Sequence, residues 1–170
     1  MRGNQMLAPR TVILYNKPNR QRASFHAGSA FNKQEDPSMK ALLIGGTGTI
    51  SLPITRKLIA QGWKVTLLNR GSKNDLVPGA EFIRCDMNDA AAAEAALEGR
   101  SFDVVAQFIA YQPDQVARDI RLFTGKTRQY IFISSASAYV KPTRNPVITD
   151  ATALSNPYWL YSRNKIACEQ

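Results

Sequence analysis

Apolar residues from position 40 onward fall into short continuous runs that alternate with longer amphipathic or alanine-rich segments. Short apolar runs bounded by turn-forming residues are typical of buried strands, and the longer segments are typical of helices. The runs predict strands at Lys40–Ile44, Lys64–Leu68, Glu81–Arg84, Asp103–Phe108 and Gln129–Ser134. The segments between them predict helices at Ile50–Gln61, Ala90–Glu98, Pro113–Phe123 and around Tyr158–Glu169.

This alternation predicts an α/β fold, a Rossmann-type doubly wound sheet of parallel strands joined by right-handed crossovers. Gly62 and Gly99 come just after two of the predicted helices, where C-cap glycines are common. The chain ends at the last predicted helix, whereas a complete dinucleotide fold continues with at least one more strand. We therefore expect a fold truncated after that helix, and a fragment that is inactive alone.

Residues 1–38 have a different character, rich in Pro, Asn, Gln and Arg, with one apolar island at Thr11–Tyr15. That island is shorter than the core of a secretory signal. The first 34 residues contain no Asp or Glu, which also suits an organellar transit peptide. Met39 stands directly before the first strand, so we expect residues 1–38 to be a mostly disordered extension or the product of a misplaced start codon.

Composition bears on the cellular compartment and on the classes of partner that the protein could bind. The 170 residues are 44% hydrophobic and 21% charged, as in one soluble domain, and no apolar stretch approaches the roughly 20 residues that span a bilayer. Cys85 and Cys168 match no metal spacing, which predicts a reducing compartment, the cytoplasm. The net charge of +9 is compatible with nucleic acid or with phosphate-rich ligands, although a solvated cationic surface is the simpler interpretation.

A glycine turn, Gly45–Ser51, follows the first predicted strand. A turn between a buried strand and a helix aims backbone N–H groups at a phosphate. Gly45 and Gly48 permit the tight bend and the approach of a pyrophosphate. Ser51 stands where a third glycine is usual, and we interpret it as tolerated with a slightly looser helix–strand contact. A glycine-rich turn without a ligand remains an alternative for this segment alone.

Other groups near this turn are candidates for the same ligand. Thr47 and Thr49 supply hydroxyl groups, and the helix that begins near Ile50 offers its positive end.

The end of the second predicted strand bears on the choice of cofactor. An acidic residue there would bind the adenosine ribose of NAD, but this chain has Asn69 followed by Arg70. The loss of a carboxylate and the gain of a guanidinium favour the 2′-phosphate of NADP over NAD. Arg70 as a solvated loop charge is the alternative. Asp86 and Met87 follow the third strand, where Asp86 accepts a hydrogen bond from adenine or caps the next helix.

A second pattern, near the end of the chain, suits proton transfer. Tyr161 and Lys165 lie four residues apart, on one face of the predicted helix. An isolated pair of this kind is usually an exposed helical pair, but here a glycine turn lies upstream. A nearby ammonium lowers the pKa of a phenol from its usual value of about 10. Tyr158 has Ser162 at the same spacing and no cation, so Tyr161 is favoured.

Serine residues end the strand before this helix. Ser134, Ser135 and Ser137 are candidates for a hydroxyl that faces the phenol and orients a substrate oxygen. His26, the only histidine, lies in the expected extension. Neither a Ser-His-Asp triad nor a histidine metal site is therefore expected.

Three ordered motifs make residues 40–170 similar to the extended short-chain dehydrogenase/reductase family, and within it to the NAD-dependent epimerase/dehydratase group. The motifs are Gly45–Gly48, Ile131–Tyr139 and Tyr161–Lys165. This resemblance implies that residues 39–170 are an NAD(P)-binding Rossmann domain and that the family's C-terminal substrate lobe is absent. Phe108, Ile109 and Ala110 match the family's segment that lies along the cofactor.

The resemblance also implies roles and partners. Ser135, Tyr161 and Lys165 match the family's active-site serine, tyrosine and lysine. Tyr161 then takes a proton from a sugar hydroxyl while hydride passes to the nicotinamide, and Lys165 holds the nicotinamide ribose and lowers the pKa of the phenol. The expected substrate is a nucleotide sugar, with epimerase, dehydratase or reductase activity, and a homodimer is compatible with the full-length protein.

Some positions depart from the family pattern. Ser51 replaces the third glycine, Asn69 replaces the NAD-selecting acid, and Asp119–Arg121 stands where many members have an asparagine. The residues Asn69–Gly71 are also similar to a divergent branch that includes chloroplast stem-loop RNA-binding proteins. An RNA-binding protein that reuses the nucleotide fold is therefore the alternative.

Overall fold

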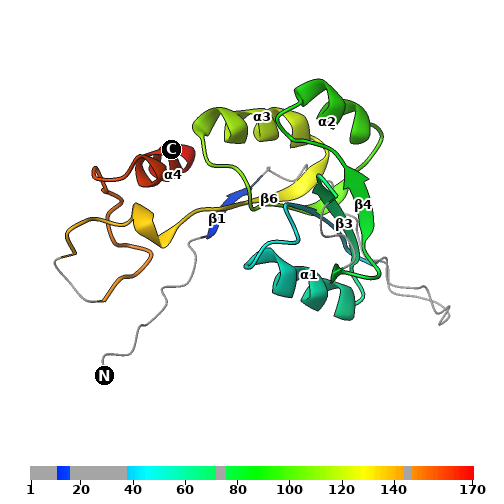
Figure 1. The fold of residues 1–170 in the computed structure, drawn as a ribbon, viewed down its shortest axis with the longest axis horizontal. Coiled ribbons are helices and arrows are strands. Elements are labelled where there is room, and N and C mark those ends of the chain that lie inside the picture. Colours follow the sequence, from blue (N-terminus) through cyan, green and yellow to red (C-terminus); the bar gives the residue numbers. More distant parts are fainter. Residues whose placement is uncertain (1–10, 16–37, 72–75, 144–146) are drawn as a thin grey trace, which may run out of the picture.

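In the part of the chain that the structure describes, six strands form one sheet, in the order β1-β6-β5-β2-β3-β4 (Figure 1). The computed structural model describes residues 11–15, 38–71, 76–143 and 147–170. Strands β2 to β6 run parallel, and β1 pairs antiparallel with β6. The strands are β1 (Thr11–Tyr15), β2 (Lys40–Ile44), β3 (Lys64–Asn69), β4 (Glu81–Arg84), β5 (Phe102–Gln107) and β6 (Thr127–Ile133).

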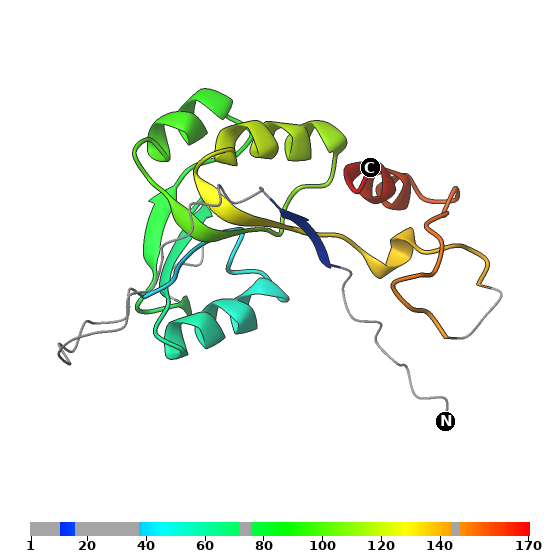
Figure 2. The same ribbon diagram turned by 180° about the vertical axis from the view of Figure 1, so that it is seen from behind.

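Helices cover both faces of the sheet, as Figures 1 and 2 show from opposite sides. Helix α1 lies on one face and helices α2 and α3 on the other, while α4 lies beyond the end of β6. The helices are α1 (Ser51–Ala60), α2 (Ala90–Ala96), α3 (Pro113–Phe123), the 3₁₀ helix η2 (Ala136–Ala138) and α4 (Leu160–Cys168). Neighbouring strands β2 and β5 connect in opposite directions, so their carboxyl ends form the crevice where such sheets bind ligands.

The core has two halves, one on each face of the sheet. Along β2, Ala41 and Leu43 belong to the cluster that packs against α1, and Leu42 and Ile44 belong to the cluster under α2 and α3. Successive strand residues point to opposite faces. A strand buried on both faces therefore needs a continuous apolar run, which explains the pattern seen in the sequence.

All five predicted strands and all four predicted helices are present, with ends shifted by at most two residues. The doubly wound α/β prediction is confirmed. Gly62 follows α1 with a φ of +81°, as a helix-ending glycine should.

The Thr11–Tyr15 island differs from the expectation of a mostly disordered N-terminal extension, because it forms β1. Thr11 lies opposite Ile133, and Tyr15 lies opposite Gln129. A run rich in β-branched residues suits a strand, and the outer edge of β6 offers backbone groups for pairing. Residues 1–10 and 16–37 of the expected extension, including His26, lie outside the described residues.

The described ranges were also searched for membrane and metal features. Within them, no helix is both long and apolar enough to cross a bilayer. The same ranges hold no group of three or more His, Cys, Asp or Glu residues that could bind a metal ion. Cys85 and Cys168 are buried free thiols.

Candidate functional site

Two hydroxyl groups of α1 hold the glycine turn that joins β2 to α1. Ser51 Oγ donates to the Gly45 carbonyl oxygen over 2.7 Å and accepts from the Gly48 N–H over 2.8 Å. Thr55 Oγ1 donates to the Gly46 carbonyl oxygen over 2.7 Å. Ser51 and Thr55 are both buried. We call these two residues the hydroxyl clamp of the turn.

The hydroxyl clamp corrects two expectations. Ser51 is not a loosely tolerated substitute for glycine, because its hydroxyl bonds two backbone groups of the turn. The N–H of Gly48 is not free for a phosphate, because Ser51 accepts it. In a trans peptide the C=O and the following N–H point in opposite directions. The bond between Thr55 and the Gly46 carbonyl therefore turns the N–H of Thr47 away from α1.

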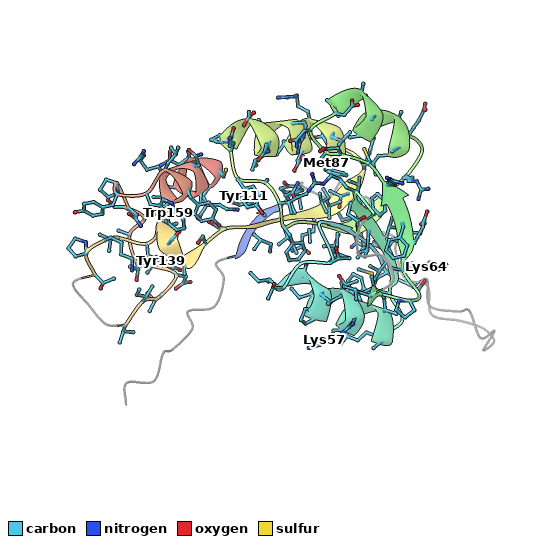
Figure 3. All side chains as sticks on the ribbon, in the orientation of Figure 1. Lys57, Lys64, Met87, Tyr111, Tyr139 and Trp159 are labelled. Atoms are coloured by element: carbon cyan, nitrogen blue, oxygen red, sulfur yellow. The ribbon has the colours of Figure 1, made fainter. Side chains whose placement is uncertain are left out.

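A cavity of about 440 Å³ opens at the carboxyl ends of strands β2 to β5. It is lined by eight of the residues predicted to bind the cofactor: Gly45, Thr47, Gly48, Asn69, Arg70, Asp86, Met87 and Ile109. Its other lining residues are Cys85, Asn88, Tyr111, Gln115 and Arg118. Figure 3 places Met87 beneath α2 and α3. The fold thus gathers most of the predicted residues around one cavity.

The lining fits an adenine dinucleotide. Asn69 Oδ1 accepts from the Gly71 N–H over 2.7 Å, whereas its Nδ2 is buried without a partner among the described residues. An unpaired buried donor is costly, which favours an acceptor from a ligand, such as a ribose hydroxyl. A Cβ at Gly48 would meet nothing nearer than Ser51 Oγ at 3.4 Å, so internal packing does not demand glycine there. The prediction that a phosphate approaches the backbone here accounts for the glycine.

Asp86 does not cap the helix that follows it. Its Oδ1 accepts from the Asn88 N–H over 2.9 Å, and the N-cap of α2 is Asp89, which accepts from the Ala92 N–H over 3.0 Å. The capping alternative for Asp86 is therefore wrong, and its role toward adenine stays a prediction.

Several predicted cofactor residues do not line the cavity. Thr49 is exposed, and Ile50 is the N-cap residue of α1, without a side-chain cap bond. Phe108 packs against the core cluster on the α1 face. Ala110 is buried, and its carbonyl oxygen accepts a bond from Lys165. Contacts of these residues with a cofactor stay predictions.

Lys165 joins the ends of two strands to α4. Its side chain is 1% exposed, and Nζ donates to the carbonyl oxygens of Ala110 over 2.7 Å and Ile133 over 2.8 Å. Burial lowers the pKa of Lys165 to about 8. The ammonium is therefore still the major form at neutral pH, and Nζ lies 5.8 Å from the ring centroid of Tyr161.

Tyr161 lies between two other aromatic rings. Its ring centroid is 6.1 Å from that of Tyr111 and 4.8 Å from that of Trp159. Tyr111 also lines the cavity and lies 5.0 Å from Lys165 Nζ. Figure 3 shows Tyr111 and Trp159 on neighbouring segments at the α4 side of the sheet. Tyr111 therefore connects the cavity to the predicted catalytic pair.

The predicted serine is tied to α4 through a second hydroxyl. Ser135 Oγ lies 2.9 Å from Ser137 Oγ, and Ser162 Oγ donates to Ser137 Oγ over 2.9 Å. Ser162 directly follows Tyr161 on α4, so the network reaches the helix that carries the phenol. Ser134 instead donates to Glu169 over 2.5 Å. Among the candidates, Ser135 and Ser137 are thus the ones joined to this network.

Sequence reasoning missed several residues that hold the site in place: Thr55, Tyr111, Asn156 and Ser162. Asn156 Nδ2 donates to the Ser137 carbonyl oxygen over 2.8 Å. The four-residue spacing of Ser51 and Thr55 on one helix face was a usable signal. The other contacts join segments far apart in the chain and left no local pattern.

Ser51→Gly would restore the usual third glycine, yet we expect it to weaken the protein. Loss of two hydrogen bonds is expected to lower the free energy of unfolding by about 2 kcal/mol and, if the predicted dinucleotide binds at this turn, to raise its Kd about 10-fold. Urea unfolding and fluorescence titration measure both. Ser101→Gly, at an exposed loop serine, is the control. A Ser51→Gly variant as stable as wild type would show that the clamp is dispensable.

The model of the NAD dependent epimerase/dehydratase family matches residues 41–170. A UDP-glucose 4-epimerase of Lactobacillus helveticus is 30% identical over 152 residues, covering 78% of this chain and 46% of that protein. A 2'-dehydrokanamycin reductase of Streptomyces kanamyceticus is 27% identical over 139 residues, covering 81% of this chain and 39% of that protein. Chloroplast stem-loop binding protein of 41 kDa b from Arabidopsis thaliana is 31% identical over 116 residues, covering 60% of this chain and 30% of that protein. The chain thus spans less than half the length of these relatives.

Solved structures share the fold. The UDP-Glc/GlcNAc 4-epimerase of Campylobacter jejuni superposes with a TM-score of 0.66 at 22% identity, covering 78% of this chain and 47% of that chain. The Bordetella bronchiseptica enzyme WbmG in complex with NAD superposes with a TM-score of 0.62 at 18% identity, covering 79% and 49%.

Proposed function

Since the chain belongs to the NAD-dependent epimerase/dehydratase family, we propose that it binds NAD(P) in the cavity at the carboxyl ends of β2 to β5. We propose further that it supplies the proton-transfer site of a nucleotide-sugar epimerase, dehydratase or related reductase. The observation that carries this proposal is the contact of Tyr111 with both the cavity and the Tyr161–Lys165 pair. The names of the epimerase and reductase relatives support the class of substrate and reaction.

The predicted site residues each have a role in this proposal. Bound NAD(P) supplies a hydride acceptor or donor. Tyr161 takes a proton from the substrate hydroxyl, and the Lys165 ammonium stabilises the phenolate that forms. Ser135 donates a hydrogen bond to the substrate oxygen. Asn69 and the turn after β2 hold the adenosine ribose and the pyrophosphate.

A direct binding measurement tests the first part of the proposal. The chain is titrated with NADPH and with NADH while tryptophan fluorescence is followed. We expect a saturable change with at least one of them. No change with either, confirmed by calorimetry, would contradict NAD(P) binding and with it the proposed reaction.

NADPH is proposed as the preferred form because Asn69 replaces the acid that binds the NAD ribose and Arg70, the next residue, supplies a guanidinium for the 2′-phosphate. Arg70→Ala is expected to raise the Kd for NADPH about 10-fold, through the loss of one charge-assisted contact, and to change the Kd for NADH little. Lys57→Ala removes the same charge from an exposed site on α1 and is the control. Equal losses for NADPH and NADH would contradict the preference.

Binding of a nucleic-acid stem-loop is the second candidate function. It is supported by the similarity to the chloroplast stem-loop binding protein and by the net charge of +9. Fluorescence anisotropy with a labelled RNA stem-loop tests it, and true binding weakens steeply as salt rises. Stem-loop binding without a response to NADPH would favour this candidate over the enzyme.

A further inference from the structure

A fully buried carboxylate on α3 organises one wall of the cavity. Asp119 is 0% exposed, and its Oδ2 accepts from Gln107 Nε2 over 2.5 Å and from the Tyr130 hydroxyl over 2.9 Å. Arg118 donates to the other oxygen, Oδ1, from Nε over 3.0 Å and from Nη2 over 2.8 Å. Burial and the Asp119 charge raise the pKa of Tyr130, so its hydroxyl keeps the proton that it donates. Both carboxylate oxygens are thus held by directed donors.

Two residues that bond Asp119, Arg118 and Gln107, link it to the cavity. Arg118 lines the cavity directly, with 16% of its side chain exposed. Gln107 Oε1 accepts from the Ile109 N–H over 2.8 Å, and Ile109 also lines the cavity. Ile109 packs so closely on the glycine turn that a Cβ at Gly45 would lie 2.5 Å from its Cγ2.

The position of Arg118 along the cavity identifies the part of the ligand that it meets. Gln115 lies one turn earlier on α3, and its Nε2 donates to Asn88 Oδ1 over 3.3 Å, in the loop after β4. In the sheet order, β3 and β4 lie on the side away from β6, whose end bonds Lys165. A dinucleotide with its reactive end at Tyr161 therefore has its other nucleotide beside the ends of β3 and β4.

We propose that Arg118 binds the adenylate half of the dinucleotide and that Asp119 is its positioning residue, an inference that rests on the proposed function. Asp119 takes the Nε and one Nη2 hydrogen, whereas Nη1 has no partner among the described residues. Because Asp119 balances the charge of the guanidinium, Arg118 contributes directed hydrogen bonds rather than net charge. Arg118 therefore contributes equally to the binding of NADPH and of NADH, unlike Arg70.

Calorimetry with ADP-ribose and with nicotinamide mononucleotide tests this assignment on the whole chain. Arg118→Met is expected to raise the Kd for ADP-ribose, NADPH and NADH each by about 10-fold, and to leave that for nicotinamide mononucleotide unchanged. Arg121→Met removes the same charge from an exposed position of α3 and is expected to change each Kd by less than about twofold. Asp119→Asn is expected to weaken ADP-ribose binding only where Arg118 is present.

The outcomes separate this inference from the proposed function. Wild type that binds neither NADPH nor ADP-ribose contradicts the proposed function itself. Wild type that binds both, with Arg118→Met indistinguishable from Arg121→Met, overturns the role of Arg118 alone. An equal loss for nicotinamide mononucleotide overturns the placement at the adenylate half. If Asp119→Asn weakens binding as much in the Arg118→Met background as in wild type, Asp119 does not act through Arg118.

Discussion

Tyr161→Phe is expected to lower kcat by about 100- to 10,000-fold, the usual contribution of a positioned acid or base, while the Kd for NADPH stays within about twofold. The substitution removes one hydroxyl and keeps the ring that packs between Tyr111 and Trp159. Binding of the cofactor and packing of α4 should therefore survive. Turnover of nucleotide sugars by the native protein, followed through nicotinamide absorbance or sugar analysis, measures the effect.

Tyr158→Phe is the matched control for this experiment. Tyr158 lies three residues before Tyr161, and it is 75% exposed. Its hydroxyl can be removed without disturbing the core, so kcat should stay near that of wild type. Full activity of Tyr161→Phe would rule out the phenol as the proton-transfer group. Loss of activity in Tyr158→Phe alone would move that role to Tyr158.

Lys165→Met is expected to have the largest effect on stability. Methionine fills a similar volume but carries no donor, so the carbonyl oxygens of Ala110 and Ile133 lose the bonds that join both strand ends to α4. Two buried acceptors without a partner are expected to lower the free energy of unfolding by about 2–4 kcal/mol. Urea unfolding measures it, with Lys57→Met at an exposed lysine as the control. An unchanged midpoint would show that the two bonds do not hold α4.

The pH dependence of the stability difference between wild type and Lys165→Met reports the protonation of Lys165. Burial lowers the pKa of this lysine from 10.5 to about 8 in the folded chain. Between these values the unfolded chain binds more protons than the folded chain, so the stability of wild type rises with pH. Below pH 8 both states are protonated and the dependence disappears. The difference in unfolding free energy between wild type and Lys165→Met should thus widen from pH 8 to 10. A difference that stays constant from pH 8 to 10 would mean that the folded chain does not lower the pKa of Lys165.

Much of the fold was predictable because its signals are local. A continuous apolar run marks β2 as a strand buried on both faces, and α3 occupies the predicted range Pro113–Phe123. The glycine turn and the Tyr161–Lys165 spacing also follow from short stretches of sequence. The edge strand β1 was not predicted, since its five residues become a strand by pairing with β6, more than a hundred residues away.

The amino-acid sequence alone determined the order of strands and helices, the bend after β2, and the presence of a phenol and an ammonium on one helical face. Only the tertiary structure decided that Ser51 bonds the bend, that the Asn69 amide finds no partner among the described residues, and that Asp119 holds Arg118 at the cavity. The physical reason is the range of the interactions. Periodicity and turn preferences act within a few residues, whereas Lys165 meets Ala110 across 55 positions of the chain, through contacts that exist only once the sheet has formed.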